Sequence, residues 1–392
     1  MRVVGLISGT SMDGLDVAVA DLDGAGSEEL LLRPLGARTA PWDAGLRRRL
    51  LGMLPPAATT IQEVAELDVL VGQASGLAAR AAIDEIASGT SDLVVSHGQT
   101  VFHWVTGGRA RGTLQLGQPA EIVEATGLPV VSDLRARDIA AGGQGAPLAG
   151  TLDVLLLRGL GLDTPVAALN LGGIANVTVV PPEGAPLAFD TGPASCLVDA
   201  TVTRLTDGRQ TYDIDGRRAA AGRVDDELLR VLLDEPFFAL PPPRSTGREL
   251  FTAGFVDRAL SRVGHPVGDD DLLATLTELT AVTVADSLAG QGVSRVYASG
   301  GGVHNPTMRA ALHRRLGAVE LRTSDELGLP VDAKEAYLMA LIGYLTWHGV
   351  PGVLPGTTGA REPHVLGRVS PAGGRVPPPP TDVRPRRLVI AR

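Results

Sequence analysis

Two similar segments, each a strand, a glycine-containing turn and a second strand, constrain the fold of this 392-residue chain most strongly. The first reads VVGLISGTSMDGLDVAVADLDG and begins at Val3, and the second reads VAALNLGGIANVTVVP and begins at Val166. Apolar runs around Gly, Ser and Asp are typical of hairpins. Because backbone amides at a tight glycine turn form an anion-binding concavity, two such turns are suited to the phosphates of a nucleotide.

A third glycine run follows a strand late in the chain. The sequence VSRVYASGGGVHNP places Gly300, Gly301 and Gly302 between a strand and a helix start at Asn305–Pro306. Glycines at this point let an adenosine lie close to the backbone. Each run taken alone also fits an ordinary hairpin turn or close helix–strand packing. The three runs in this order favour nucleotide binding.

Alternating strand and helix patterns predict an α/β fold. The length suits two lobes of roughly 150 to 200 residues each. We expect an N-terminal lobe over residues 1–160, a C-terminal lobe over residues 161–372, and a loose Pro- and Arg-rich tail over residues 373–392. A short strand over 93–96 is expected to open into the segment HGQTVFH. The helical patterns cover about 44–54, 61–86, 195–205, 225–233, 247–263, 270–290 and 333–347.

The composition excludes several classes of protein. The only lysine, Lys334, lies in DAKEA, so the chain has no P-loop. A formal net charge of -9 argues against a nucleic-acid partner. With Cys196 as the only cysteine, no intrachain disulfide forms, and a reducing compartment fits best. We find no secretory signal and no run of 18 apolar residues. We therefore expect a cytoplasmic protein without a membrane partner.

Several longer blocks resemble a known family. The chain is similar to the anhydro-N-acetylmuramic acid kinases over residues 1 to about 371. The blocks that carry the resemblance are SGTSMDGLD (8–16), SHGQTVFH (96–103), SDLRARDIAAGGQGAPL (132–148), NLGGIANVT (170–178), FDTGP (189–193), STGRELF (245–251), GGGVHNP (300–306) and DAKEA (332–336).

The resemblance implies a fold and a reaction. The fold is the two-lobed sugar-kinase/Hsp70/actin-like (ribonuclease H-like) fold, with an active-site cleft between the lobes. The reaction uses ATP and Mg2+ to phosphorylate 1,6-anhydro-N-acetylmuramic acid while water opens the anhydro ring. Its product, N-acetylmuramic acid 6-phosphate, belongs to peptidoglycan recycling and amino-sugar catabolism. A homodimer is implied as well.

The resemblance also assigns the glycine runs to ATP. The first loop supplies amides and hydroxyls, and its Asp13 and Asp16 offer oxygen to Mg2+ or its waters. Asp16 alone equally fits a solvated residue at a strand start. The complete set of expected ATP-binding residues is Gly9, Thr10, Ser11, Met12, Asp13, Gly14, Asp16, Gly172, Gly173, Asn176, Gly300, Gly301, Gly302 and Asn305.

Ring opening requires a base that takes a proton from the attacking water. Asp190, expected at the end of a strand on a glycine-containing loop, is that base by resemblance, and Glu335 shares the water. Asp190 also fits an Asx turn or a metal ligand. Glu335 also fits a first-turn residue that interacts favourably with the helix dipole.

The substrate carries a lactyl carboxylate, for which arginine is the suitable partner. Arg135 and Arg137 in SDLRARD are the candidates, and His97 and Gln99 are expected to reach sugar hydroxyls. His97 equally fits a satisfied structural histidine. Asp138 fits a partner for an arginine rather than a substrate contact.

Two positions depart from the family pattern. Ala194-Ser195 follow FDTGP where Gly-Asn is usual, and Arg244 precedes STGRE where lysine is usual. Two other functions remain open on the residues alone. An actin- or Hsp70-like ATPase would leave SDLRARD and HGQT unexplained, and a glycoside hydrolase using Asp190 and Glu335 would leave the glycine turns without a role.

Overall fold

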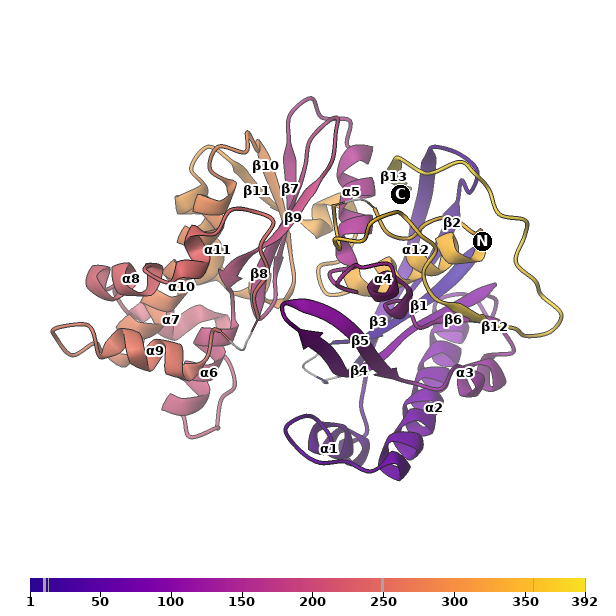
Figure 1. Ribbon diagram of the computed structural model, residues 1–392, viewed down its shortest axis with the longest axis horizontal. Coiled ribbons are helices and arrows are strands. Elements are labelled where there is room, and N and C mark those ends of the chain that lie inside the picture. Colours follow the sequence, from indigo (N-terminus) through magenta and orange to yellow (C-terminus); the bar gives the residue numbers. More distant parts are fainter. Residues whose placement is uncertain (10–11, 13, 248–249, 355, 392) are drawn as a thin grey trace. The chain divides into compact units, whose positions relative to one another are not determined.

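The computed structural model describes residues 1–392 except 10–11, 13, 248–249, 355 and 392 (Figure 1). The chain forms two compact units. Unit 1 consists of Met1–Leu160 and Gly328–Arg392, and unit 2 of Gly161–Leu327. Each unit is built on one mixed β-sheet with helices packed against it. The predicted α/β class with two lobes is therefore confirmed.

Unit 1 contains both ends of the chain. Its sheet has the order β12-β6-β4-β1-β2-β3-β13, and β5 pairs with β4 outside this path. Its strands are β1 (Arg2–Ser8), β2 (Gly14–Asp23), β3 (Glu29–Pro41), β4 (Leu93–Thr106), β5 (Arg109–Leu116), β6 (Val130–Ser132), β12 (Arg368–Ser370) and β13 (Arg387–Ile390). Its helices are α1 (Ala44–Gly52), α2 (Ile61–Glu85), α3 (Pro119–Thr126), α4 (Ala136–Ala140), α5 (Ala149–Gly159) and α12 (Lys334–Trp347).

Unit 2 has a smaller sheet, in the order β11-β10-β7-β8-β9. Its strands are β7 (Val166–Leu171), β8 (Ile174–Val180), β9 (Leu187–Pro193), β10 (Arg295–Ser299) and β11 (Glu320–Thr323). Its α-helices are α6 (Cys196–Leu205), α7 (Arg217–Ala221), α8 (Asp226–Leu233), α9 (Ala253–Leu260), α10 (Asp269–Leu288) and α11 (Pro306–Leu316). Four short 3-10 helices are η1 (Ile214–Gly216), η2 (Pro236–Ala239), η3 (Gly301–His304) and η4 (Ser324–Leu327).

The two sheets repeat one strand order. In unit 1, β3, β2 and β1 form an antiparallel meander, and β4 and β6 follow parallel to β1. In unit 2, β9, β8 and β7 form the same meander, and β10 and β11 follow parallel to β7. Both meanders begin with the strand–glycine-turn–strand segments of the sequence. This repeated order is the ribonuclease H-like arrangement that the resemblance implies.

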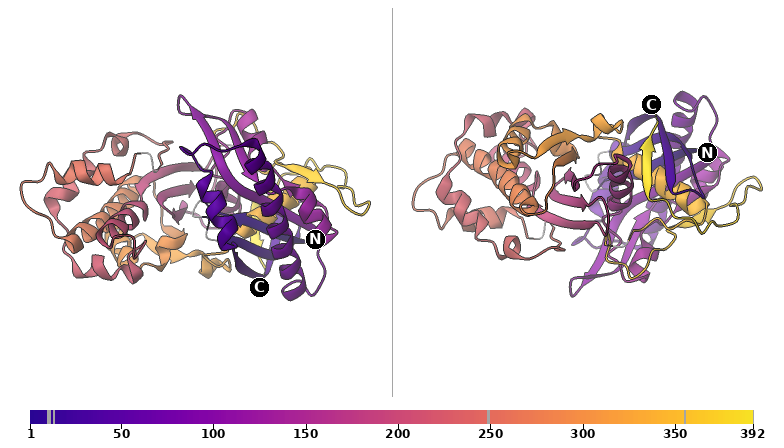
Figure 2. Two further views of the ribbon diagram at one scale, coloured as in Figure 1. Left: turned by 90° about the horizontal axis from the view of Figure 1, so that it is seen from below. Right: turned by 90° about the horizontal axis from the view of Figure 1, so that it is seen from above.

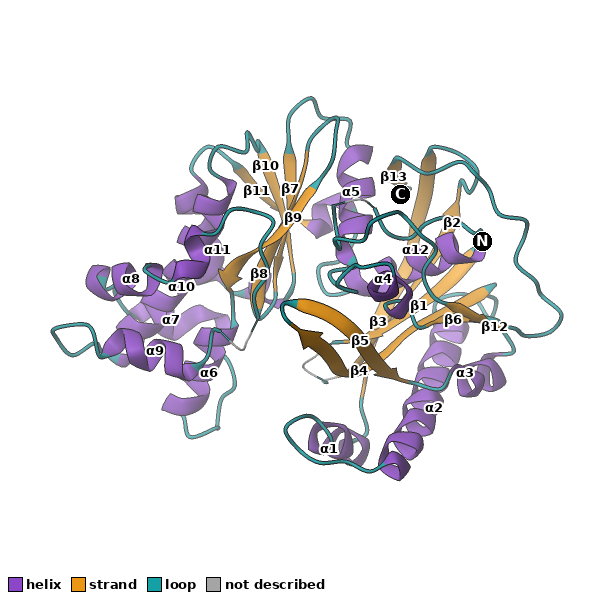
Figure 3. Cartoon of the chain, in the orientation of Figure 1, coloured by secondary structure: helices purple, strands orange, loops and turns teal. Residues whose placement is uncertain are grey.

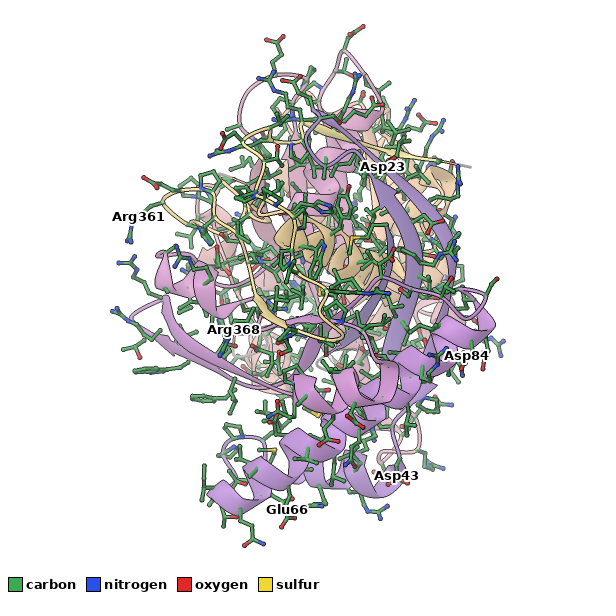
Figure 4. All side chains as sticks on the ribbon, turned by 90° about the vertical axis from the view of Figure 1, so that its right-hand side faces the viewer. Asp23, Asp43, Glu66, Asp84, Arg361 and Arg368 are labelled. Carbon is green, nitrogen blue, oxygen red and sulfur yellow. The ribbon has the colours of Figure 1, made fainter. Side chains whose placement is uncertain are left out.

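The C-terminal part of the chain departs from the expected division. Residues 328–372 belong to unit 1, not to the second lobe. The prediction of a loose tail is also wrong, because β13 pairs in parallel with β3 and Ala391 N donates to Leu32 O (2.9 Å). In Figure 2 this yellow C-terminal strand lies beside the indigo N-terminal strands. At the opposite edge of the same sheet, β12 pairs with β6. Arg368 of β12, labelled in Figure 4, donates through its Nε to Asp133 Oδ2 (2.7 Å).

Helix α12 packs directly on the sheet of unit 1. Almost all of its residues are buried, which is typical of a helix covered on every side. A Cβ on Gly5 of β1 would lie 2.2 Å from Ala336 O, and one on Gly343 would lie 2.0 Å from a methyl of Val95 on β4. These glycines let helix and strands approach closely, and this contact fixes the position of the residues at the start of α12.

Two local predictions are corrected by long-range pairing. The strand expected over 93–96 is longer than predicted, because β4 has 14 residues and includes HGQTVFH. Beyond Gln99, β4 leaves β1 and continues as a two-stranded ribbon with β5 (Figure 3). The helix expected over 247–263 is shorter in the described residues, where α9 covers Ala253–Leu260.

Among the described residues, no helix is long and apolar enough to cross a membrane.

Candidate active site

In both units the predicted site residues gather where parallel strands end. In unit 1, β1 ends at Ser8, and β4 reaches the same level at Gln99. In unit 2, β7 ends at Leu171 and β10 at Ser299, and a glycine run follows each strand. Ligands of open α/β sheets bind outside the carboxyl ends of such strands. Each unit thus presents its candidate residues at the edge where this chemistry is expected.

The first glycine loop is described only in part, because Thr10, Ser11 and Asp13 lie outside the described residues. Gly9 O accepts a hydrogen bond from Met12 N (3.2 Å). The side chain of Met12 lies in the hydrophobic core, so this residue can face a nucleotide only through its backbone. Gly14 begins β2, and a Cβ there would lie 2.7 Å from Ala40 O. Close packing of β2 on β3 therefore accounts for Gly14.

Asp16 lies on β2, next to the first loop. Its Oδ1 accepts a hydrogen bond from Thr39 Oγ1 (2.6 Å). Burial raises the pKa of Asp16, the bond from Thr39 lowers it, and the charge of Asp332 raises it again. The described residues contain no group of three or more His, Cys, Asp or Glu side chains that could hold a metal ion. Since Mg2+ often takes only one or two carboxylates and completes its shell with waters and phosphates, a site built on Asp16 fits it.

Gln99 is fully buried, and both ends of its amide bind other protein groups. Its Oε1 accepts from Ser8 Oγ (2.6 Å), and its Nε2 donates to Gly9 O (3.4 Å) and Thr100 O (3.2 Å). Trp42 Nε1 in turn donates to Ser8 Oγ (3.2 Å). This network holds the first glycine loop against β4. Contact of Gln99 with sugar hydroxyls stays a prediction.

The buried His97 forms a pair with the half-buried Arg135. Arg135 Nε donates to His97 Nε2 (2.7 Å), and Arg135 Nη1 donates to Gly145 O (2.5 Å). His97 Nδ1 lies 2.9 Å from Gly98 O. A guanidinium can only donate, so Nε2 accepts, Nδ1 carries the proton, and the imidazole is neutral. Burial and the charge of Arg135 lower the pKa of His97 to about 3. This geometry favours orientation of Arg135 over direct contact with the sugar.

The depressed pKa predicts how stability depends on pH. When the pH is below about 6.5, the ordinary pKa of histidine, His97 is protonated in the unfolded chain but stays neutral in the folded protein until the pH approaches 3. The stabilising contribution is therefore complete above pH ~6.5 and is lost as the pH falls towards 3. We expect the free energy of unfolding of the wild type to fall about 1.4 kcal/mol per pH unit more steeply than that of His97→Gln between pH ~6 and ~4.

Tryptophan fluorescence during urea unfolding measures this difference, because Trp42, Trp104 and Trp347 all lie in unit 1. Arg80→Gln, which alters an exposed ion pair with Asp84 on α2, serves as the control with the wild-type slope. Parallel pH profiles for the wild type and His97→Gln would contradict the assignment of a neutral His97.

The two neighbours of Arg135 in SDLRARD differ in their surroundings. Arg137 is exposed on α4 and has no ion pair among the described residues. Asp138 is fully buried and accepts from Gly145 N (2.7 Å) and Thr358 Oγ1 (2.7 Å), with His364 Nε2 3.5 Å away. Asp138 is thus a structural residue, although its partners are not the arginine that the sequence suggests.

Glu335 lies in the first turn of α12, after Lys334. Lys334 is buried, and its Nζ lies 2.6 Å from Asp153 Oδ1 in an ion pair rather than a directed hydrogen bond. The Glu335 side chain is exposed, yet protein atoms crowd its carboxyl group, and this partial burial raises its pKa. The charges of Arg135 and Lys334 oppose the rise, and those of Asp16 and Asp153 add to it. This environment differs from that of a solvated first-turn glutamate.

In unit 2, the Gly172-Gly173 turn is bonded to the start of α6. Ala194 N and Cys196 N donate to Gly173 O (3.0 and 3.1 Å), and Ser195 N donates to Gly172 O (3.1 Å). Carbonyls of the turn therefore satisfy amides that the beginning of a helix leaves without intrahelical partners. Ala194 and Ser195, which depart from the family pattern, contribute only backbone groups to these bonds.

In the third glycine run, two glycines are packed closely against neighbouring residues and one has open space beside it. A Cβ on Gly300 would lie 2.5 Å from Asn170 Oδ1, and one on Gly302 would lie 2.8 Å from Leu171 Cβ. Gly301 is exposed and has open space where a side chain would stand, as expected for a residue that a nucleotide approaches. Asn305 caps α11, since its side chain accepts from Thr307 N and Met308 N (3.0 Å each).

A polar row crosses four strands of the sheet in unit 2. Ser299 is paired with Asn170, Asn170 with Asn176, and Asn176 with Asp190. Residues that oppose each other on neighbouring strands share one face of a sheet. Asp190 lies in the middle of β9, so its expected position at a strand end is wrong; a bulge between Ala175 and Asn176 sets this register.

The carboxylate of Asp190 is held from a distant segment. Its Oδ2 accepts from Thr246 N (2.8 Å) and Ser245 Oγ (3.0 Å). Its backbone pairs with Arg244, because Asp190 N donates to Arg244 O (2.9 Å) and Arg244 Nε donates to Asp190 O (3.1 Å). An Asx turn would join the carboxylate to an amide only two residues away. The residues that bind Asp190 lie 55 and 56 positions later, so these contacts are not those of an Asx turn.

Some residues near these groups were not predicted. His103 is exposed on the β4–β5 ribbon, and partial burial together with the charge of Arg135 lowers its pKa. Its position in SHGQTVFH was the available signal, but alternation along a strand becomes visible only once β4 is known to continue. Ser8 and Asn170 lie at the ends of the repeated first strands, next to the glycine runs, and this position was the available signal for them.

Comparison with known proteins identifies the family. The family described as "Anhydro-N-acetylmuramic acid kinase" matches residues 1–372. The chain belongs to the anhydro-N-acetylmuramic acid kinase family. A relative of that name from Streptomyces coelicolor is 55% identical over 394 residues, which cover 100% of this chain and 99% of the relative. Another from Rhodococcus erythropolis is 48% identical and covers 96% of each chain.

The family match also bears on the C-terminal residues. It stops at residue 372, whereas the Streptomyces coelicolor relative aligns with the whole chain, including β13. Among solved structures, a ROK hexokinase from Thermus thermophilus is similar over 88% of this chain and 99% of that chain, at 17% identity and a TM-score of 0.31. A score this low supports no argument, so the fold rests on the strand order of the two sheets.

Proposed function

We propose that this chain uses ATP to phosphorylate 1,6-anhydro-N-acetylmuramic acid and opens the anhydro ring with water in the same reaction. The family match over residues 1–372 carries the proposal. The product, N-acetylmuramic acid 6-phosphate, places the reaction in peptidoglycan recycling. In the balanced reaction, the water oxygen bonds to the anomeric carbon while the bond from that carbon to the bridging oxygen breaks. The bridging oxygen bonds to the γ-phosphorus, and ADP leaves.

Unit 2 supplies the base. Asp190 takes the proton of the attacking water, and the donors from Ser245 and Thr246 orient its carboxylate for this transfer. Because a sheet strand carries Asp190, its backbone is held on both sides by β8 and Arg244. A base fixed in this way needs little reorganisation when the water approaches. Gly301 offers open backbone near the end of β10 for the adenosine.

Unit 1 supplies the group that recognises the acid of the substrate. Arg135 binds the lactyl carboxylate, with His97 and Gly145 O fixing its guanidinium beforehand. Of the five N–H groups of an arginine, these two bonds use two, and the others have no partner among the described residues. A planar pair of donors therefore stays available for a carboxylate. Glu335 acts with Asp190 on the water.

Asp16 would hold Mg2+, together with Asp13, which lies outside the described residues. When bound, Mg2+ supplies positive charge that neutralises the β- and γ-phosphates. We also propose a cytoplasmic homodimer, on the resemblance alone. The ATPase and hydrolase alternatives receive less support, because neither accounts for membership of a sugar-kinase family.

Turnover in heavy-oxygen water tests the coupling of the two steps. We expect conversion of the anhydro sugar only when ATP and Mg2+ are present, with the solvent oxygen on the anomeric carbon and the sugar oxygen in the phosphate ester. Free N-acetylmuramic acid should be a poor substrate, because its own anomeric hydroxyl occupies the place of the attacking water. Mass spectrometry locates the label before the anomeric hydroxyl exchanges with solvent.

Three controls complete the experiment: omission of ATP, omission of Mg2+, and a reaction in ordinary water. Sugar opening without ATP would favour the hydrolase. Label in the phosphate ester would show that water attacks C6 instead of the anomeric carbon, and efficient phosphorylation of the opened sugar would show that hydrolysis and phosphorylation are separate. Either result would refute the coupled reaction.

A further inference from the structure

Arg244 joins three parts of unit 2 through one guanidinium group. Its Nη1 donates to Phe238 O (2.7 Å) and Leu240 O (2.8 Å), at and after η2. Its Nη2 donates to Ser287 Oγ on α10 (2.8 Å), and its Nε donates to Asp190 O on β9 (3.1 Å). A side chain that satisfies four acceptors in one plane uses the fork that distinguishes arginine from lysine.

The chain before Arg244 explains why such an anchor is needed. Residues 241–243 are all proline and have no backbone N–H with which to bond to the rest of the unit. The guanidinium follows this proline run in the sequence and donates to carbonyls that precede it, so the side chain bridges the two ends of the run. Its two other hydrogen bonds attach this bridged segment to β9 and α10. The residues after Arg244 are thereby placed beside Asp190.

Aromatic rings reinforce this anchor. The guanidinium carbon of Arg244 lies 5.0 Å from the ring centroid of Phe237 and 5.9 Å from that of Phe189. Phe237 also packs edge-on against Phe238 and Phe251. A cation held over rings and partly removed from water is bound more firmly than an exposed one. Five of the six phenylalanines of the chain lie in unit 2. Four of these five form one cluster of ring contacts: Phe237, Phe238, Phe251 and Phe255.

We propose that Arg244 is a positioning residue for the base, and this inference rests on the proposed function. Arg244 fixes the segment that delivers Ser245 Oγ and Thr246 N to Asp190 Oδ2, and so sets the direction of the carboxylate. Its hydrogen bonds with Asp190 use only backbone atoms of Asp190. Burial lowers the pKa of Arg244 and the charge of Asp190 raises it, so the cation also acts on the carboxylate through its charge. A catalytic group displaced by about 1 Å can lose on the order of a hundredfold in rate.

The test is a double-mutant cycle with Arg244→Met and Asp190→Asn. We expect Arg244→Met to lower kcat roughly a hundredfold and to leave KM for ATP within about threefold of the wild type. If Arg244 acts through Asp190, the double variant should be no slower than Asp190→Asn alone. A double variant slower by the full factor that Arg244→Met costs the wild type would overturn the proposal. An unchanged kcat in Arg244→Met would overturn it too.

Further variants separate positioning from general stability. Arg244→Lys keeps a cation near Phe237, so we expect its kcat within about tenfold of the wild type. Arg262→Met, which breaks an exposed ion pair with Asp234, is the matched control with wild-type kcat. If Arg244→Met does not fold, Ser245→Ala decides: it should lower kcat about tenfold, the equivalent of one hydrogen bond, at an unchanged melting temperature.

Hydrogen exchange gives a readout that does not depend on the substrate. The amide of Thr246 donates to Asp190 Oδ2, so it should exchange faster in Arg244→Met than in the wild type or in Arg262→Met. Equal exchange in all three would count against the proposal. A wild type that does not convert the anhydro sugar with ATP would instead refute the proposed function, whatever the exchange rates are.

Discussion

Asp190→Asn should fold normally, bind ATP as the wild type does, and lose roughly a thousandfold or more in kcat, since loss of a general base costs at least ~10²–10⁴. The substitution keeps the shape of the side chain. Ser245 Oγ and Thr246 N are both donors in their bonds to Asp190 Oδ2, and the amide oxygen of asparagine accepts equally well. The fold therefore has no reason to change, whereas an amide cannot take the proton of water.

Steady-state kinetics with saturating ATP measures the loss, and calorimetric titration with a non-hydrolysable ATP analogue measures binding. Asp257→Asn is the matched control, because Asp257 forms an exposed ion pair with Arg204 in the same unit. Turnover within about tenfold of the wild type would show that Asp190 is not the base. A selective loss of ATP affinity with unchanged kcat would point instead to a role at the phosphates or their metal.

The sequence predicted the features that repeat along the chain. Both strand–turn–strand segments form the first hairpins of their sheets, and the GGG run follows β10. These patterns are local, because apolar runs and glycines are neighbours in the sequence. Helix α12 was equally predictable, since the residues that follow Lys334 and Glu335 are almost all hydrophobic.

Pairing between distant segments was not predictable. Nothing in HGQTVFH states that β4 continues past Gln99 to pair with β5, and nothing in the Pro- and Arg-rich C-terminus indicates that β13 pairs with β3. The site shows the same limit. The bonds of His97 and Gln99 with Arg135, Ser8 and nearby carbonyls could not be predicted from the sequence, and their contact with the sugar stays a prediction. Residue type indicates what a side chain can bond, and only the fold decides which partner it meets.

Arg135→Met should lower kcat/KM for the anhydro sugar by roughly thirtyfold to several thousandfold, because removal of one partner from a buried charge pair costs about 2–5 kcal/mol. The guanidinium of Arg135 is held in a fixed orientation before the substrate binds. His97 Nε2 and Gly145 O fix its plane, and burial lowers the pKa of Arg135 while the charges of Glu335 and Asp138 raise it. A desolvated, oriented cation gains more from a carboxylate than an exposed one does.

The prediction is specific to the lactyl group. An anhydro sugar that lacks this group, tested at equal concentration, should be a poor substrate of the wild type and should lose no further activity in Arg135→Met. Arg137→Met should lose less than about tenfold, since an exposed, unpaired arginine contributes little binding energy. Arg80→Met, on the surface of α2, should match the wild type. If both sugars lose activity equally in Arg135→Met, Arg135 supports the fold of unit 1 rather than the carboxylate, and the carboxylate is recognised elsewhere.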